Sequence, residues 1–409
     1  MQLNLAAEFQ GTAAGEEAKA IVGKCVHCGF CTATCPTFQV LGDERDSPRG
    51  RIYLIKQVLE GAEVTDQTRL HLDRCLTCRN CETTCPSGVQ YGHLIDIGRQ
   101  VVEAKTTRPF TERATRYALK EGIPSSLFKP AMNLGRKFKG LVPEKLQAKL
   151  PDPRPAGTLP TRSHARKVLL LNGCAQPAML PSIDAATARV LDALGVQAVI
   201  APKSGCCGAV RFHMNDQDGG RNDMRRNIDA WWPMVEKGEV EAIVMNASGC
   251  GATVREYDHH LKDDPAYAEK ARAITALVKD IGEYLAPQID ALKPLLKGTA
   301  QAKAVFHPPC TLQHWQKLRP ITEDLLAQCG VELQAFGESH LCCGSAGAYS
   351  MLQPEIATQL RDRKLGHLEA AEPEVILSAN IGCLTHLQSG TQRPVLHWIE
   401  WVDQQLAGA

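Results

Sequence analysis

Two runs of closely spaced cysteines constrain the fold of this chain more than any other feature of its sequence. The spacing C-x2-C-x2-C-x3-C-P occurs at Cys25, Cys28, Cys31, Cys35 and Pro36, and again at Cys75, Cys78, Cys81, Cys85 and Pro86. In the bacterial pattern of this kind, three thiolates wrap one [4Fe-4S] cluster and the fourth ligates the other cluster. The sequence therefore predicts one cluster on Cys25, Cys28, Cys31 and Cys85, and a second on Cys75, Cys78, Cys81 and Cys35.

Zinc is the main alternative for such a set of thiolates. Zinc sites usually pair two C-x2-C knuckles and need neither a third equally spaced cysteine nor the trailing proline. The spacing therefore favours iron–sulfur clusters.

The segment between the two cysteine runs is predicted to be a helix. Ser47 suits an N-cap, Pro48 the first helical position and Gly61 the end, with apolar residues at helical spacing between them. A helix here, in place of a short hairpin, indicates the helical kind of two-cluster ferredoxin domain. Arg49 and Arg51 at its start are expected to be solvated.

The second half of the chain contains an internal duplication. A single cysteine, 31 further residues and a Cys-Cys-Gly sequence recur with an offset of 136 residues, and a fourth cysteine follows in each copy. The two sets are Cys174, Cys206, Cys207 and Cys250, and Cys310, Cys342, Cys343 and Cys383. Cys329 belongs to neither set.

Each copy, called here a CCG unit, is predicted to have an α/β fold. A short apolar run (168–171 and 304–306) leads to the first cysteine, and a helical pattern follows. Since open α/β sheets place ligands at the carboxyl ends of their strands, the four cysteines of a unit are expected to converge there. Gly208 and Gly344 would free the backbone beside them.

These patterns predict an α+β multidomain protein. The expected parts are a helical ferredoxin-type domain with two [4Fe-4S] clusters over 1–104, a basic helical linker over 105–166, a first CCG unit over 167–300 and a second over 301–409. No G-x-G-x-x-G or P-loop motif is present, so no flavin site and no catalytic residue are expected on this chain.

The linker has a basic amphipathic pattern. Residues 105–167 carry fifteen Lys or Arg against four Asp or Glu. Apolar residues recur every three to five positions at Phe128, Ala131, Leu134, Phe138, Leu141 and Leu146. Such a stripe is more often packed against the protein itself or a partner, although it also suits an anionic membrane surface. Pro143 would divide the helix.

Composition excludes several classes of protein. The 409 residues carry 46 Lys or Arg and 45 Asp or Glu, so no global field would recruit nucleic acid. No apolar run reaches the length of a membrane span and the first residues do not resemble a signal peptide, so a cytoplasmic location is expected, with peripheral contact at the inner face of the membrane allowed by the linker. In that compartment 17 cysteines indicate metal or redox chemistry rather than disulfides.

The chemistry of the CCG cysteines stays open at this point. Four thiols suffice for a metal, and adjacent cysteines suit two irons of a cluster better than one tetrahedral ion. A further iron–sulfur cluster, structural zinc, a redox dithiol and inert core thiols are all consistent with the pattern.

Several histidines and tryptophans lie near these motifs. His27, His213, His307 and His340 are candidate ligands or proton donors, yet for each one packing or hydrogen bonding is the more frequent role. Trp231, Trp232, Trp398 and Trp401 are expected in the core or at an interface.

The motifs together resemble a known family. Tandem ferredoxin runs followed by two CCG units are similar to the iron–sulfur subunits of flavin-linked hydroxyacid and glycerol-phosphate dehydrogenases and to heterodisulfide reductase subunits. The stretches CVHCGFCTATCP, PRGRIYLIKQVLEG, CLTCRNCETTCPSG, NIDAWWP, ASGCG, CTLQH, SHLCCGSAG and ANIGC most resemble the family of bacterial glycolate oxidase iron–sulfur subunits.

That resemblance implies a function in electron transfer. Partner flavin subunits would oxidise glycolate to glyoxylate, and this chain would pass electrons toward membrane quinone. Lactate, glycerol 3-phosphate or heterodisulfide chemistry on the same framework is an alternative, as is a structural adaptor whose CCG units hold zinc.

The sequence departs from the family at one point. There a CCG unit can end in C-x2-C and supply five thiolates to a non-cubane cluster, but Ala247 and Asn380 replace the first cysteine of that pair. The five-ligand site is thereby put in doubt.

Overall fold

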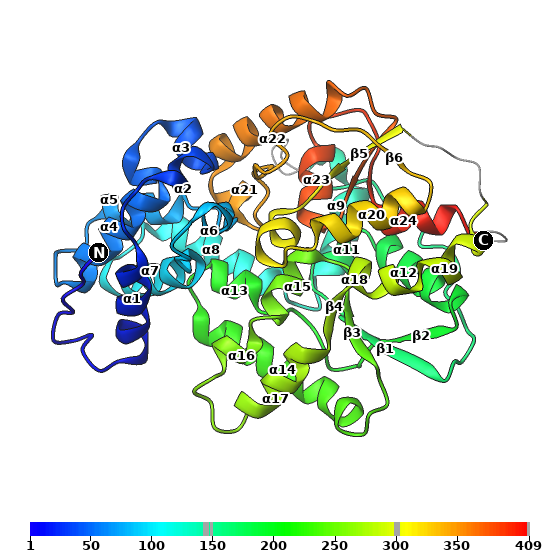
Figure 1. The fold of residues 1–409 in the computed structure, drawn as a ribbon, viewed down its shortest axis with the longest axis horizontal. Helices are drawn as coiled ribbons and strands as arrows, with labels where there is room; N and C mark the ends of the chain where they lie inside the picture. Colours follow the sequence, from blue (N-terminus) through cyan, green and yellow to red (C-terminus); the bar gives the residue numbers. More distant parts are fainter. Residues whose placement is uncertain (142–146, 148–149, 298–302, 407–409) are drawn as a thin grey trace.

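The computed structural model describes residues 1–141, 147, 150–297 and 303–406. A helical N-terminal domain lies at one end of the molecule, and two α/β units lie side by side at the other (Figure 1). The expected α+β multidomain fold, with a helical ferredoxin-type domain followed by two CCG units, is confirmed.

The N-terminal domain consists of short helices around the two cysteine runs. They are α1 (Ala13–Lys24), α2 (Phe30–Ala33), α3 (Pro36–Leu41), a 3-10 turn (Glu44–Asp46), α4 (Pro48–Leu59), α5 (Asp66–Asp73), α6 (Asn80–Thr84) and α7 (Tyr91–Lys105). Its core joins apolar faces of α1, α4 and α7, including Ile21, Ile55 and Leu94.

Helix α4 is the helix expected between the cysteine runs. The side chain of Ser47 accepts a hydrogen bond from the backbone N–H of Gly50 at 3.0 Å, and Pro48 occupies the first turn. The N-cap prediction is therefore confirmed.

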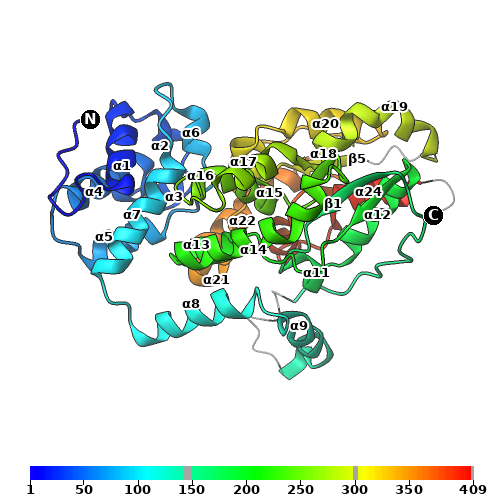
Figure 2. The same cartoon turned by 90° about the horizontal axis from the view of Figure 1, so that it is seen from below.

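Two linker helices run along one side of the molecule, α8 (Phe110–Gly122) and α9 (Phe128–Lys137), with a 3-10 turn (Lys139–Leu141) after them (Figure 2). Leu134 and Leu141 are 60% and 84% exposed, and among the residues of α9 only Met132 is buried. Of the expected packing on the protein itself or on a partner, the first is therefore wrong for these side chains. Leu146 and Pro143 lie outside the described residues.

The first CCG unit is built on a four-stranded parallel sheet with the order β2-β1-β3-β4. Its elements are β1 (Arg166–Leu170), α11 (Gln176–Met179), α12 (Ser182–Ala193), β2 (Val196–Val199), α13 (Ala209–His213), α14 (Gln217–Glu236), β3 (Ala242–Met245), α15 (Ser248–Val254), α16 (Tyr257–His260), α17 (Ala268–Leu277), β4 (Val278–Asp280), α18 (Ile281–Leu285) and α19 (Ile289–Leu292), with 3-10 turns at Ala286–Gln288 and Lys293–Leu295.

The second CCG unit repeats this topology with the sheet order β6-β5-β7-β8. Its elements are β5 (Lys303–His307), a π-helical turn η5 (Thr311–Trp315), α20 (Arg319–Gln328), β6 (Glu332–Leu333), α21 (Tyr349–Leu352), α22 (Pro354–Glu369), β7 (Val375–Ser378), α23 (Ile381–Gln388), β8 (Val395–His397) and α24 (Trp398–Gln404). The identical strand order in the two sheets confirms the duplication.

The two CCG units pack against each other through helices at equivalent positions. Helix α24 of the second unit packs on α12 of the first, and α18 of the first packs on α20 of the second. Apolar residues from both sheets, including Val168 and Val305, belong to one continuous core. The units therefore stabilise each other through equivalent surfaces.

No helix in the described part of the chain is both long and apolar enough to span a bilayer.

Candidate iron–sulfur and thiol centres

The first cysteine run lines a cavity that is open at the surface of the N-terminal domain. Its cysteines are Cys25, Cys28, Cys31, Cys81 and Cys85, and its walls include Ile52, Val89 and Tyr91. Cys85, from the second run, thus lies with the three closely spaced cysteines of the first. Cys28 is exposed, and burial together with the neighbouring Cys25 thiol raises the pKa of Cys31 to about 11.

The second run lines a neighbouring cavity deeper in the domain. Its cysteines are Cys35, Cys75, Cys78 and Cys81. Cys35, from the first run, therefore lies with the three closely spaced cysteines of the second run, just as Cys85 lies with those of the first. Burial raises the pKa of Cys81 well above its usual value, so this sulfur would need a cation beside it to be held as a thiolate.

The two cysteine loops have the same backbone conformation. His27 and Thr77 have φ values of 60° and 50°, and Gly29 and Arg79, two positions later, have 86° and 57°. In the second loop this turn directs the backbone N–H of Thr77 at Sγ of Cys75, to which it donates a hydrogen bond at 3.3 Å. Such N–H groups stabilise cluster-bound thiolates.

Arg79 keeps this unfavourable backbone conformation because both sides of its guanidinium have partners. It donates to a carboxylate oxygen of Glu256 at 2.8 Å and lies 3.5 Å from the centre of the Trp315 ring. Glu256 belongs to the first CCG unit and Trp315 to the second, so this one side chain fixes the second cysteine loop to both units.

Arg51 is a feature that the sequence did not reveal. The expectation that it is solvated is wrong, because its side chain is 1% exposed and forms an ion pair with Asp46 at 3.3 Å. It also donates to Thr37, whose hydroxyl lies 3.3 Å from Sγ of Cys35. A buried cation beside the second cavity is suited to balancing a cluster held by four thiolates.

In the first CCG unit the four cysteines converge at the carboxyl end of the sheet. Cys174 follows β1, Cys206 and Cys207 precede α13, and Cys250 lies in α15. The sulfurs of Cys174 and Cys206 are 3.6 Å apart, and the Cys207 thiol interacts with those of Cys206 and Cys250.

In the second unit the equivalent cysteines converge in the same way and are all buried. Cys343 interacts with Cys342 on one side and Cys383 on the other. Interactions with Cys342 and with Cys78, together with burial, raise the pKa of the Cys310 thiol well above its usual value. This contact joins the second CCG unit to the second ferredoxin cavity.

The glycines after each cysteine pair are required by the backbone. Gly208 and Gly344 have φ values of 97° and 88°, and a Cβ atom on them would lie 2.8 Å from the carbonyl oxygen of Gly220 and 2.5 Å from that of Ala357. The prediction that glycine frees the backbone at these positions is confirmed.

The residues present do not fit a five-thiolate non-cubane cluster. Ala247 is buried without a donor atom, and Asn380 accepts a hydrogen bond from the N–H of Gly249 at 3.2 Å and donates to Sγ of Cys383 at 3.8 Å. Asn380 therefore holds one remaining thiol and connects the two units. The two ferredoxin cavities, each lined by its predicted set of four cysteines, do fit [4Fe-4S] clusters.

The other residues singled out from the sequence have varied positions. Trp231, Trp398 and Trp401 are in the core, and Trp232 is partly buried. His213 is partly buried, and desolvation lowers its pKa to about 4. His340 is partly exposed and uses its carbonyl to accept from Asn80. Cys329 is buried at the end of α20, in the core.

Comparison with known proteins agrees with this arrangement. Residues 21–89 match the family described as the 4Fe-4S dicluster domain, and residues 168–255 and 304–388 match the family described as the cysteine-rich domain.

Similar proteins cover nearly the whole chain. It is 52% identical over 410 residues, 99% of each chain, to the glycolate oxidase iron–sulfur subunit of Escherichia coli (strain K12). It is 32% identical over 399 residues, 90% of this chain and 89% of the other, to a probable glycolate oxidase iron–sulfur subunit of Bacillus subtilis (strain 168). Lactate utilization protein A of Halalkalibacterium halodurans is 25% identical over 249 residues, 58% of this chain and 97% of its own length.

Proposed function

Because this chain belongs to the family of glycolate oxidase iron–sulfur subunits, we propose that it transfers electrons from partner flavin subunits, where glycolate is oxidised to glyoxylate, toward membrane quinone. The observation that carries the proposal is the pair of adjacent cysteine-lined cavities, one open at the surface and the other in contact with the second CCG unit.

Eight cysteines would hold the cofactors. Cys25, Cys28, Cys31 and Cys85 would ligate one [4Fe-4S] cluster, and Cys75, Cys78, Cys81 and Cys35 the other. When bound, such clusters supply one-electron redox chemistry, which suits a flavin partner that splits a two-electron oxidation. Cys81 lines both cavities, so the two cluster sites are directly adjacent.

The surface around the first cavity suits a redox partner. Cys28 is exposed there, and Val26 and Phe30 beside it are 68% and 61% exposed. Exposed apolar side chains next to a cofactor cavity are typical of a docking surface. We infer that the flavin subunits bind here, where the distance from flavin to the first ligand set would be shortest.

The opposite end of the path would involve the second CCG unit. Cys310 contacts Cys78, and Tyr349 donates through its hydroxyl to the carbonyl of Arg74 at 3.0 Å. Contacts of this kind fix the unit against the second ligand set. The contacts of the first CCG unit with the N-terminal domain include charged groups around Glu256 and Glu17.

Attachment to the membrane would use the linker helices. Leu134, Phe138 and Leu141 are exposed beside the exposed cations Lys137 and Lys139. Apolar side chains flanked by positive charge are suited to an anionic lipid surface. We propose a cytoplasmic protein with peripheral contact at the inner face of the membrane, close to the quinone.

The test uses the complex of this chain with its flavin subunits, purified without oxygen. We expect about eight iron and eight sulfide per chain from two clusters, and glycolate should generate the EPR signals of reduced clusters, which a soluble quinone should abolish. Unchanged glycolate-dependent quinone reduction by a complex lacking this chain would refute the proposal.

Replacing the substrate tests the alternatives. Lactate or glycerol 3-phosphate should leave the clusters oxidised under conditions in which glycolate reduces them. A complex in which flavin and quinone exchange electrons at the full rate while the clusters stay oxidised would instead indicate a structural adaptor.

A further inference from the structure

One histidine in the second CCG unit has surroundings that hydrogen bonding does not explain. His307, the last residue of β5, is fully buried. Neither ring nitrogen has a hydrogen-bond partner among the described residues. Buried polar atoms in folded proteins nearly always have a partner, so a ring that leaves both nitrogens unpaired calls for another ligand.

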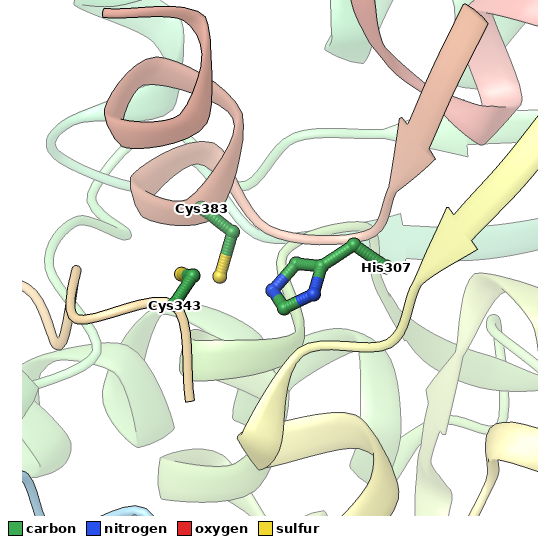
Figure 3. A group of neighbouring side chains, drawn as sticks. All are labelled: His307, Cys343 and Cys383. Carbon is green, nitrogen blue, oxygen red and sulfur yellow. The ribbon is translucent and has the colours of Figure 1, made fainter. Parts of the chain in front are cut away.

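The imidazole faces two cysteine sulfurs. A ring nitrogen of His307 and the Sγ atoms of Cys343 and Cys383 all lie within 4.8 Å of one another. Figure 3 shows the His307 ring beside the Cys383 thiol, with Cys343 next to them, where β5, the cysteine-pair loop and α23 meet. The three groups come from three separate segments of the second unit.

The internal duplication supplies a comparison within the same chain. The offset of 136 residues that relates Cys174 to Cys310 places Leu171 at the position of His307. Leu171 is buried in the apolar core of the first unit. Both units keep the cysteine pair and the fourth cysteine, so the histidine is the donor that distinguishes the second unit.

We propose that the second CCG unit binds one zinc ion through His307, Cys343 and Cys383. One imidazole and two thiolates are a typical donor set for zinc. With bonds of about 2.0–2.3 Å, ligand atoms around a tetrahedral ion lie about 3.5–4 Å apart, so a small contraction of the observed group suffices.

Neighbouring contacts support these ligands. Asn380 donates to Sγ of Cys383 at 3.8 Å, and the hydroxyl of Ser378 donates to the carbonyl of His307 at 2.9 Å. Sγ of Cys342 accepts from the N–H of Gly344 at 3.4 Å and interacts with Cys310. Cys342 thus interacts with Cys343 on one side and with Cys310 on the other, and a fourth position on the ion is left for another ligand.

This inference does not depend on the proposed electron-transfer function, because Zn²⁺ has no redox chemistry of its own. The test measures zinc and iron in the anaerobically purified full-length protein. We expect one zinc per chain beside about eight iron, with X-ray absorption showing two sulfurs at about 2.3 Å and a nitrogen at about 2.0–2.1 Å.

The decisive variant is His307→Leu, which reproduces the first unit. It should lose the zinc and keep the iron, whereas Cys329→Ser, which removes another buried cysteine of the same unit, should keep both. His307→Cys should retain zinc with a third sulfur in place of the nitrogen, and it decides the question if His307→Leu does not fold.

Three results would overturn the proposal. They are protein without zinc, zinc that stays in His307→Leu with an unchanged absorption spectrum, and iron above eight with matching sulfide that is lost on replacing His307. The last result would assign a third cluster to these residues. In each case glycolate-driven reduction of the two ferredoxin clusters is measured separately, so the two proposals fail independently.

Discussion

At the scale of single residues, the exchange of one cysteine between the two runs ties the N-terminal domain together. Cys85 lines the cavity of the first run, and Cys35 lines that of the second. Each cluster would thus be held by residues some fifty positions apart, and neither run would be able to complete a ligand set alone.

The variant Cys85→Ser tests this exchange. We expect it to damage the cluster of Cys25, Cys28 and Cys31, because a hydroxyl is a poorer ligand for iron than a thiolate. EPR of the reduced protein should show one signal altered or lost and the other intact, and Cys329→Ser serves as the control. Damage confined to the cluster of Cys75, Cys78 and Cys81 would show the ligand assignment to be wrong.

The residues of the candidate sites differ in how well the sequence alone predicts their roles. The cysteines could be predicted because metal ligation fixes their spacing along the chain. The burial of Arg51 could not, because its partners Asp46 and Thr37 are brought to it by the fold. His307 was visible as a candidate, but its lack of hydrogen-bond partners is a property of the folded protein alone.

At the scale of secondary structure elements, the duplication was evident where strands are long and apolar. The runs at 168–171 and 304–306 correspond to β1 and β5. The last strand of each sheet has only three residues, too few for a periodic pattern. The helix after each of these short strands begins with a capping box, formed by Asp280 with Glu283 at the start of α18 and by His397 with Glu400 at the start of α24.

The exposed stripe on α9 and the turn after it gives a prediction at this scale. Replacing both Leu134 and Leu141 by Glu should lower binding of the full-length protein to anionic vesicles at least tenfold, because it removes apolar contact and adds negative charge. Vesicle co-sedimentation measures this. Leu159→Glu, at a side chain also 60% exposed but outside any helix, should bind normally. Equal binding by all variants would exclude the stripe as a membrane contact.

At the scale of the whole molecule, a charged network holds the N-terminal domain against the first CCG unit. Glu256 accepts from Arg79 at 2.8 Å and lies 3.2 Å from a ring nitrogen of His93, which stacks on His259 at 3.8 Å. Burial alone would raise the pKa of Glu256, but His93 and the Arg79 guanidinium hold it far below its usual value.

Removing this carboxylate should loosen the domain interface. Glu256→Gln removes the nearer carboxylate from the buried Arg79, leaving only Glu82 at 3.9 Å, and should cost about 3 kcal/mol, seen as a lower midpoint of thermal unfolding at neutral pH. Because the pKa is lowered on folding, the contribution is complete above the usual pKa of 4.5 and declines as pH falls below it. The difference from the unaltered protein should therefore narrow toward about pH 4 and below.

The control is Glu269→Gln, at a carboxylate whose side chain is 93% exposed. It should leave the midpoint unchanged at every pH. A Glu256→Gln effect that is absent, or that has the same size at all pH values, would contradict the role given to this network.

The packing of helices between the two CCG units has a consequence for synthesis on the ribosome. Domains usually fold in the order in which they are made. Helix α12 is translated long before α24, the helix that covers it. The apolar surface of the earlier unit therefore stays uncovered until the later unit is complete, and surface exposed in this way during translation is prone to aggregation.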